Sequence, residues 1–307
     1  MVLASLPEPS WIDEVGPVPG VELVAWDLHA APERADEVEI VIPPYIDPSL
    51  DYDLLGGLPR LRAVQLLTAG YEQVAPHVPD GVRLCNAAGV HDASTAELAL
   101  SLILASLRGI PEFVLAQRSS TWLPTHLWPA LADKRVLVVG YGHVGKAVVR
   151  RLLPFEVEVT AVASRPRAGD DLVDAVHGID ELPDLLGRHD IVVLIVPLTG
   201  ATSGLAGAAF LAAMPDGALL VNVARGKVVD TDALLAETSS GRLRAALDVT
   251  DPEPLPPDHA LWRSPGVLIS PHIGGASSAF RPRAVRLVRA QLEAYAAGSP
   301  LENVVQG

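Results

Sequence analysis

Near its middle the chain reads Arg135-Val-Leu-Val-Val-Gly-Tyr-Gly-His-Val-Gly-Lys-Ala-Val-Val149. The apolar run Val136–Val139 predicts a buried strand, and the residues after the glycines predict the start of a helix. Three glycines shape the turn between them: Gly140 permits the tight bend, Gly142 lets a pyrophosphate approach the backbone, and Gly145 lets the helix pack close to its strand. This order predicts a dinucleotide-binding βα unit with the phosphates at the helix N-terminus. A glycine-rich turn without a ligand is the alternative.

The composition indicates a folded protein with two domains. The 307 residues suffice for two domains of ordinary size, and the apolar content of 49% with a charged content of 20% is typical of a globular chain. The net charge of −14 argues against nucleic acid or an anionic membrane as the main partner. A small anionic substrate would need a local positive site against this acidic background. We expect no metal site.

Cysteine use and the N-terminal residues indicate a cytoplasmic protein. Because Cys85 is the single cysteine, no intramolecular disulfide can form, and we expect it to fill a core in a reducing compartment. Met1–Pro9 carries no basic segment followed by an apolar run, so no signal peptide is expected. The longest apolar stretch, residues 96–107, is broken by Glu97 and Ser101, which favours a buried helix over a membrane span.

Short apolar runs alternate with helical stretches along the chain. We expect strands at residues 21–26, 38–42, 61–67, 82–85, 136–139, 157–163, 191–196, 218–223, 244–249 and 267–269. Helices are expected at residues 96–108, 144–153, 182–186, 230–237 and 284–297, the last returning to the first domain. Several strands are almost wholly apolar, which predicts a doubly wound parallel sheet covered on both faces. Residues 111–131, rich in Trp, Pro and His, are expected to form an irregular arm that contacts a second copy or packs over the nucleotide domain.

The strand at residues 61–67 ends in the small-residue turn Thr68-Ala69-Gly70. Such a turn leaves backbone N–H groups free at the carboxyl edge of a sheet, where ligands of α/β proteins bind. Ala69 and Gly70 are therefore candidates for an anion cradle, and a plain β-to-α turn is the alternative.

The residues that follow the strand at 157–163 indicate which dinucleotide is bound. An NAD site usually has a carboxylate there for the ribose 2′-hydroxyl, but this chain has Ala163 followed by Ser164, Arg165, Pro166 and Arg167. A guanidinium can pair with a 2′-phosphate, and a serine hydroxyl can donate to it. We therefore expect NADP(H) to be preferred, with NAD(H) as the alternative. If the arginines bind no cofactor, they are two solvated side chains on a loop.

Three polar residues follow successive strands of the same predicted sheet. Arg225 lies in Asn222-Val-Ala-Arg-Gly226, Glu253 in Asp251-Pro-Glu-Pro-Leu-Pro256, and His272 in Ser270-Pro-His-Ile-Gly-Gly275. Singly, each could be an ion-paired arginine, a surface acid or a capped histidine. Because carboxyl ends of parallel strands meet at one edge, we expect the three to form a catalytic group beside the nicotinamide.

With these motifs in order, the chain resembles the D-isomer-specific 2-hydroxyacid dehydrogenases, in particular glyoxylate/hydroxypyruvate reductases. The resemblance is carried by Val138-Val-Gly-Tyr-Gly-His-Val-Gly145, Val221-Asn-Val-Ala-Arg-Gly-Lys-Val-Val-Asp230, Ala246-Leu-Asp-Val249 and Ser270-Pro-His-Ile-Gly-Gly275. It implies an α/β fold with two Rossmann-like domains. Residues 98–276 would form the doubly wound dinucleotide-binding domain, and residues 1–97 plus 277–307 a smaller, flavodoxin-like substrate domain.

The resemblance also implies a role for each candidate residue. Hydride would pass between NADP(H) and a 2-keto or 2-hydroxy acid, with His272 as general acid toward the developing alkoxide. Glu253 would hydrogen-bond the imidazole, favour its protonated form and fix its orientation, while Arg225 would hold the substrate carboxylate and polarise the carbonyl. Ala69 and Gly70 would complete the carboxylate site. Cofactor contacts are implied for the backbone of His143 and Val144, for Pro197 and Thr202 on the adenosine and phosphate side, for Ala224, and for Asp248 at the nicotinamide carboxamide.

The chain departs from common family patterns in two places. The missing acid at Ala163 puts an NAD preference in doubt, and residues 276–280 lack the Thr and Glu that many relatives place there. Pro44 and Tyr45 are candidates to line the substrate pocket, with simple packing as the alternative.

The leading hypothesis is an NADPH-preferring reductase of glyoxylate, hydroxypyruvate or a larger 2-keto acid. An NAD-linked 2-hydroxyacid dehydrogenase is the nearest alternative. A nucleotide-sensing binding protein without catalysis is a third, against which the retention of Arg225, Glu253 and His272 argues. A homodimer is expected because relatives are usually dimers.

Overall fold

The computed structural model describes all 307 residues, which form two compact units. The first unit comprises Met1–His91 and Ser278–Gly307, and the second comprises Asp92–Ser277. The chain passes into the second unit where helix α2 (Asp92–Leu107) begins, whereas the sequence placed the boundary at residue 97. The earlier boundary has a physical reason: Ala96, Ala99 and Ile103 of this helix are fully buried in the core of the second unit.

The second unit contains an eight-stranded sheet whose strand order is β13-β12-β11-β10-β6-β7-β9-β8. All neighbouring pairs are parallel except β8 with β9. Counted from β6, the strands β9-β7-β6-β10-β11-β12 follow the 3-2-1-4-5-6 order of a Rossmann domain, and β13 and β8 extend it at the two edges. The order reverses between β6 and β10, where such sheets bind ligands. The strands are β6 (Arg135–Val139), β7 (Glu158–Ala163), β8 (Arg167–Ala168), β9 (Ala175–Gly178), β10 (Ile191–Leu194), β11 (Leu219–Asn222), β12 (Arg244–Leu247) and β13 (Val267–Ile269).

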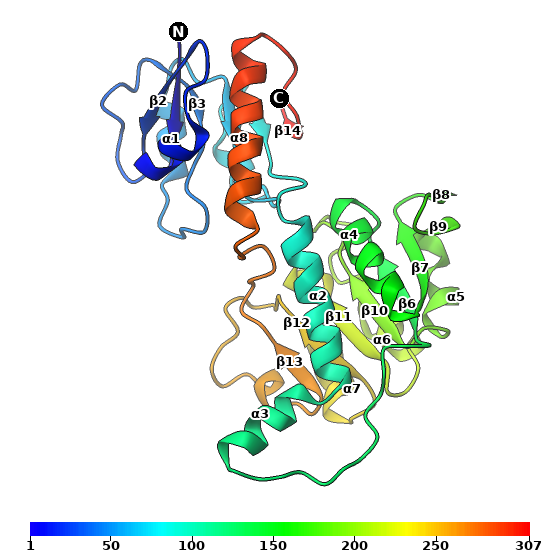
Figure 1. Cartoon of the computed structure of the whole chain (residues 1–307). Helices are drawn as coiled ribbons and strands as arrows, with labels where there is room; N and C mark the ends of the chain where they lie inside the picture. Colours follow the sequence, from blue (N-terminus) through cyan, green and yellow to red (C-terminus); the bar gives the residue numbers. More distant parts are fainter. The chain divides into compact units, whose positions relative to one another are not determined.

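Helices cover both faces of this sheet (Figure 1). Val136 and Val138 of β6 pack with α2 and α4 (His143–Leu152), whereas Leu137 and Val139 pack in the cluster on the opposite face. That opposite cluster receives side chains of α5 (Leu182–Leu186), α6 (Ala208–Ala213) and α7 (Thr231–Ser239). Because neighbouring side chains of a strand point to opposite faces, a strand buried on both must be continuously apolar, as β6 is.

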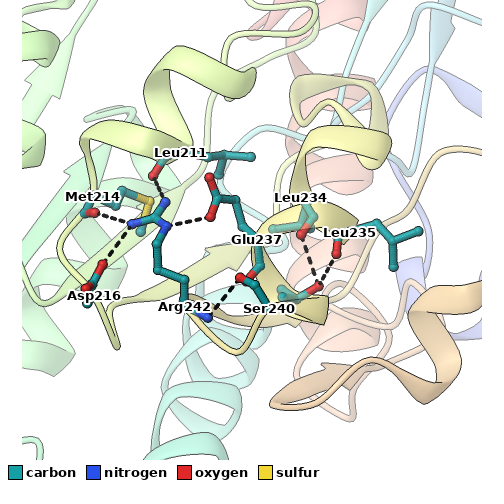
Figure 2. Close-up of polar contacts among 9 residues, drawn as sticks. Leu211, Met214, Asp216, Leu234, Leu235, Glu237, Ser240 and Arg242 are labelled. Atoms are coloured by element: carbon teal, nitrogen blue, oxygen red, sulfur yellow. Dashed lines mark hydrogen bonds and ion pairs between the residues drawn. The ribbon is translucent and has the colours of Figure 1, made fainter.

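The guanidinium of Arg242 links α6 and α7, which lie on the same face of the sheet (Figure 2). Its Nη1 and Nη2 donate to the carbonyl oxygens of Met214 and Leu211 at 2.8 and 2.6 Å, and its Nε lies 2.5 Å from Oε2 of Glu237. The pairing with Arg242 lowers the pKa of Glu237. One side chain thus satisfies free carbonyls at the C-terminal end of α6 and anchors the last turn of α7.

The first unit contains a six-stranded sheet whose strand order is β14-β5-β4-β3-β1-β2. Its five parallel strands follow the flavodoxin-like order 2-1-3-4-5, and β14 adds an antiparallel edge. The expected fold class, with one Rossmann-like and one smaller flavodoxin-like domain, is confirmed. The strands are β1 (Val2–Leu6), β2 (Val21–Ala25), β3 (Val38–Val41), β4 (Ala63–Gln65), β5 (Arg83–Cys85) and β14 (Val304–Gln306).

Two helices cover one face of this sheet. Trp11 of α1 (Pro9–Val15) and Val288 of α8 (Phe280–Ala296) lie in one cluster with the inward side chains of β1 and β3. Within the same unit, the buried amide of Gln291 donates to Oε1 of Gln65 at 2.6 Å, which fastens α8 to the end of β4. Cys85 is fully buried, as expected of a core residue.

Residues 110–118 correct one sequence prediction. They form helix α3 (Ile110–Arg118) instead of an irregular arm, and only the following segment to residue 130 lacks regular structure. Pro111 is compatible with this helix because it occupies the first turn, where its missing N–H group needs no partner within the helix. The actual break is Gly109, which adopts a left-handed conformation with φ of 64°.

No single helix is long and apolar enough to cross a membrane. Helices α2 and α3 together reach that length and composition, but they are bent by 68° where they meet. Half of the residues of α2 are buried in the protein core, as expected of a core helix.

Candidate active site

The glycine turn after β6 has the geometry that the sequence predicts. Gly140 has φ of +112°, and a Cβ there would lie 2.3 Å from the carbonyl oxygen of Ile195. A Cβ on Gly145 would lie 2.0 Å from the carbonyl oxygen of Gly140, so only glycine lets α4 approach the strand this closely. Gly142 differs from both, because nothing lies within 4 Å of the position its Cβ would take.

The open space at Gly142 fits a dinucleotide pyrophosphate. Gly142 is the N-cap residue of α4, and no side chain caps the helix. The first amides of a helix have no partner within it and carry a partial positive charge. The backbone of His143 and Val144 is therefore suited to an anion, while the exposed His143 side chain points to no separate catalytic role. Their contact with a cofactor stays a prediction.

The segment after β7 holds two arginines, of which only one makes a hydrogen bond to the protein. Ser164 and Arg165 are exposed and make no hydrogen bond or ion pair. Arg167, by contrast, donates from Nη2 to the carbonyl oxygen of Tyr141 at 2.8 Å. Both arginines are predicted cofactor ligands, and the structure leaves only Arg165 unengaged.

The turn after β10 is shaped by Thr202. Its hydroxyl donates to the carbonyl oxygen of Pro197 at 2.6 Å and accepts from the amide of Thr199 at 2.8 Å. Pro197 itself is exposed at the carboxyl end of β10, next to the glycine turn across the switch point. Pro197 and Thr202 thus belong to one turn after the carboxyl end of β10, and their contact with the cofactor stays a prediction.

The turn that carries Arg225 is built by Asn222. The buried Asn222 side chain donates to the carbonyl oxygen of Arg225 at 3.0 Å and accepts from the amide of Ala224 at 3.1 Å. Arg225 uses Nη1 to bind the carbonyl oxygen of Ala224 at 2.8 Å, which leaves the rest of the fork without a protein partner. A half-buried guanidinium with free N–H groups is suited to a carboxylate.

His272 and Glu253 form a hydrogen-bonded pair. The distance from Nδ1 of His272 to Oε1 of Glu253 is 2.5 Å, and both side chains are partly exposed. Because Nδ1 is engaged, Nε2 is the ring nitrogen left to exchange a proton with a substrate. The expected contact between these two residues is present.

His272 has a backbone conformation that a non-glycine residue rarely adopts. Its φ is +51°, and such outliers persist only where the surroundings impose them. Here the amide of His272 donates to the carbonyl oxygen of Asp248 at 2.8 Å. The buried Asp248 carboxylate accepts from Ser270, Ile273 and Gly274 at 2.6, 3.0 and 2.8 Å. The structure therefore shows Asp248 shaping the histidine loop, and its predicted contact with nicotinamide stays a prediction.

The three candidate catalytic residues follow three adjacent strands, β11, β12 and β13. The first two turns touch, because a Cβ on Gly226 would lie 1.8 Å from the carbonyl oxygen of Thr250. The segment from Thr250 then leads to Glu253 and so to the imidazole. The sheet edge thus gathers a guanidinium, a carboxylate and an imidazole, although only the last two are in direct contact.

In the first unit, Ala69 and Gly70 follow β4. Their carbonyl oxygens accept hydrogen bonds from Asn86 at 2.8 Å and from Thr68 at 2.7 Å, whereas their amides donate to no protein group. Two neighbouring free amides suit a carboxylate, and their role in substrate binding stays a prediction. Tyr45, the predicted pocket residue, stacks on Phe280 with ring centroids 4.0 Å apart.

Sequence reasoning missed the residues that hold the site in place. Asn222, Ser270 and Asp170 bind backbone or side-chain groups of the loops described here. A buried polar side chain immediately after an apolar strand is a usable signal, and Asn222 carries it. No signal of this kind marks Asp170, whose partners lie 24 and 29 residues earlier in the chain.

Comparisons with known proteins agree with this geometry. Residues 100–274 match the family described as D-isomer specific 2-hydroxyacid dehydrogenase, NAD binding domain. The chain is 32% identical to the glyoxylate reductase/hydroxypyruvate reductase of Homo sapiens, over 79% of this chain and 76% of that protein. It is 33% identical to the glyoxylate reductase of Thermofilum pendens, over 81% and 76%.

A solved structure shows the same architecture over the whole length. The D-isomer specific 2-hydroxyacid dehydrogenase of Xanthobacter autotrophicus Py2, in complex with NADPH and MES, is 29% identical and superposes with a TM-score of 0.82 over 99% of this chain and 98% of that one. The resemblance noted from the motifs is thereby confirmed. This chain belongs to the D-isomer-specific 2-hydroxyacid dehydrogenases, a family of oxidoreductases that use a nicotinamide dinucleotide.

Proposed function

We propose that this protein reduces a small 2-keto acid, such as glyoxylate or hydroxypyruvate, and prefers NADPH. The observation that carries the reductase is the pair of His272 and Glu253, held at the ligand edge of the sheet in an imposed backbone conformation. The relatives that share 32–33% identity over most of the chain are named as reductases of these keto acids.

His272 is the proton donor in this proposal. The bound cofactor supplies the hydride, and the negative charge that develops on the substrate oxygen needs a proton. With Nδ1 of His272 fixed on Glu253 at 2.5 Å, Nε2 delivers that proton, and the carboxylate keeps the ring oriented.

Arg225 is the substrate-binding cation. Its turn is fixed by Asn222, and the part of its guanidinium that does not bind Ala224 is available to a carboxylate. A planar fork holds a carboxylate at two points and so orients the adjacent carbonyl. A 2-keto acid, whose carboxylate is one bond from the reacting carbon, offers one group to Arg225 and one to His272.

The NADPH preference rests on the end of β7. Ala163 stands where a carboxylate would reject a 2′-phosphate, and Arg165 beside it is exposed and unpaired. The solved relative from Xanthobacter autotrophicus, which binds NADPH, is consistent with this preference. Asp170, the nearest acid in the following loop, is already paired with Lys146 at 2.7 Å.

A substrate screen tests the proposal. Initial rates would be measured with glyoxylate, hydroxypyruvate and bulkier 2-keto acids, each with NADPH and NADH. We expect oxidation of the cofactor with a small keto acid and a higher kcat/KM for NADPH. Faster turnover with NADH would overturn the cofactor preference alone, whereas no turnover with any pair would overturn the reductase.

We also propose that two copies associate through α3 and the segment that follows it. Phe113 and Trp128 pack edge to face, while Trp122 and Leu127 are 96% and 99% exposed. Burial of such side chains against a second copy would remove this apolar area from water. Light scattering should give the mass of a dimer for the wild-type chain and a monomer for Trp122→Ser.

A further inference from the structure

A second polar cluster surrounds the glycine turn and has no part in the chemistry described so far. At its centre is Tyr141, the residue between Gly140 and Gly142, whose side chain is almost fully buried. The Tyr141 hydroxyl donates to Oδ1 of Asp170 at 2.8 Å, and Nζ of Lys146 lies 2.7 Å from Oδ2 of the same carboxylate. Arg167 donates to the Tyr141 carbonyl oxygen at 2.8 Å.

The electrostatics of the cluster favour a fixed geometry. Hydrogen bonds from Lys146 and Tyr141 keep the pKa of Asp170 far below its ordinary value, while burial and the neighbouring carboxylate raise the pKa of Tyr141. Asp170 thus remains charged and Tyr141 protonated across the working range of most proteins. The cations of Lys146 and Arg167 also lie 5.4 and 5.8 Å from the Tyr141 ring centroid.

The loop that carries Asp170 is closed by its own hydrogen bonds. The amide of Asp170 donates to the carbonyl oxygen of Val173, and the amide of Leu172 donates to Oδ1 of Asp170 at 3.0 Å. A Cβ on Gly169 would lie 1.9 Å from the Val173 carbonyl oxygen, so the turn leaves no room for a side chain at position 169. The cluster therefore joins two hydrogen-bonded or closely packed backbone segments, the glycine turn and residues 164–174.

We propose that Tyr141, Lys146, Asp170 and Arg167 form a brace that fixes the glycine turn against the segment after β7. In this arrangement Arg167 is a positioning residue, and Arg165 with Ser164 is what distinguishes NADPH from NADH. The inference rests on the proposed NADPH preference. It adds that selectivity resides in one arginine, whereas the other sets the affinity for either cofactor.

The distinction between the two arginines follows from the protein hydrogen bonds that each guanidinium makes. Arg167 already donates to the Tyr141 carbonyl oxygen, and its guanidinium lies over the Tyr141 ring. Removal of Arg167 therefore loosens the turn that holds the pyrophosphate common to both cofactors. Arg165 is exposed and makes no hydrogen bond or ion pair, so its removal should leave NAD⁺ binding unchanged and affect only a cofactor that carries a 2′-phosphate. Replacement of Arg165 should therefore change the ratio of the two cofactor affinities, whereas replacement of Arg167 should weaken both affinities equally.

Calorimetric titration of the full-length protein with NADP⁺ and with NAD⁺ tests the brace without reference to turnover. Arg165→Ala should weaken NADP⁺ binding by ~10–100-fold, the value of a charge-assisted contact, and leave NAD⁺ binding unchanged. Arg167→Ala and Tyr141→Phe should each weaken both cofactors by the same factor, ~3–10-fold, and leave their affinity ratio unchanged. Arg167→Lys retains a donor and should recover part of the loss.

Controls separate the brace from the fold and from the cofactor preference. Arg150→Ala removes a charge from α4 that makes no hydrogen bond or ion pair, and it should leave both affinities unchanged. Thermal unfolding of each variant identifies any loss of folded protein. A selective loss of NADP⁺ in Arg167→Ala, or no loss in Tyr141→Phe, would overturn the brace. An unchanged affinity ratio in Arg165→Ala would instead overturn the assignment of selectivity to Arg165.

Discussion

Replacement of the turn glycines by alanine should distinguish the glycine that the fold requires from the one that cofactor binding requires. A methyl group on Gly145 would lie 2.0 Å from a backbone oxygen, more than 1 Å inside ordinary contact, and α4 must move away from β6 to admit it. Overpacking of this kind typically costs ~1–3 kcal/mol, and a clash with backbone lies at the upper end. The same methyl group on Gly142 meets no atom within 4 Å, and φ there is −93°, which alanine adopts freely.

Gly142→Ala should therefore fold like the wild type and bind the cofactor poorly. If the pyrophosphate lies against this backbone, the methyl group displaces it from the helix amides. Loss of one or two charge-assisted hydrogen bonds, worth ~1.5–3 kcal/mol, corresponds to ~10–150-fold weaker binding. Gly145→Ala should lose ~2–3 kcal/mol of unfolding free energy before any ligand is added.

Urea unfolding followed by circular dichroism, together with calorimetric titration of NADP⁺ and NAD⁺, measures both quantities on the same samples. The reasoning fails if Gly142→Ala loses as much stability as Gly145→Ala, because the space beside Gly142 would then not be free. It also fails if Gly142→Ala binds both cofactors with wild-type affinity, since the phosphates would then lie elsewhere.

Three further perturbations have defined outcomes. His272→Asn should lower kcat by ~10²–10⁴-fold while the calorimetric Kd for cofactor is unchanged; a loss below tenfold would show that another group donates the proton. Arg242→Met leaves two carbonyls and Glu237 without their donor and should cost ~2–4 kcal/mol in urea unfolding, whereas Arg263→Met, at an exposed arginine, should cost nothing. Burial lowers the pKa of His189, so the unfolded chain takes up a proton that the folded chain does not, and stability present above about pH 6.5 should be lost as the pH falls. Unfolding free energies between pH 7.5 and 5.5 should decline less steeply for His189→Gln, and parallel curves would contradict this linkage.

Much of the second unit could be predicted because its sequence patterns arise from short-range constraints. The strand at Val136–Val139 must be apolar throughout to be buried on both faces, and Gly140 and Gly145 after it are required by backbone contacts under 2.5 Å. The short helix at residues 182–186 and the strand at 267–269 also have the predicted bounds. The pairing of His272 with Glu253 is implied by the family resemblance, and the structure shows that their strands, β13 and β12, are neighbours.

The remainder depended on contacts between distant residues or on elements with weak patterns. The strand β1 at Val2–Leu6 is absent from the predicted strands, although both β2 and β3 pair with it. The edge strand β14 has three residues, too few for a periodic signal. The cofactor contact of Asp248 stays a prediction, but its role in the loop could not be predicted, because its hydrogen bonds extend 22 to 26 residues along the chain and no local pattern indicates them.

The discontinuity of the first unit has a consequence for synthesis on the ribosome. Residues 92–277 form the second unit from one continuous stretch, so its core can close as soon as that stretch has emerged. The first unit must wait for α8, whose Val288 and Leu292 complete its core. At ~5–20 residues per second the interval is roughly 10–40 s. During that interval the part of the nascent N-terminal sheet that α8 covers is without its helix, so its apolar side chains stay exposed to water longer than those of the second unit.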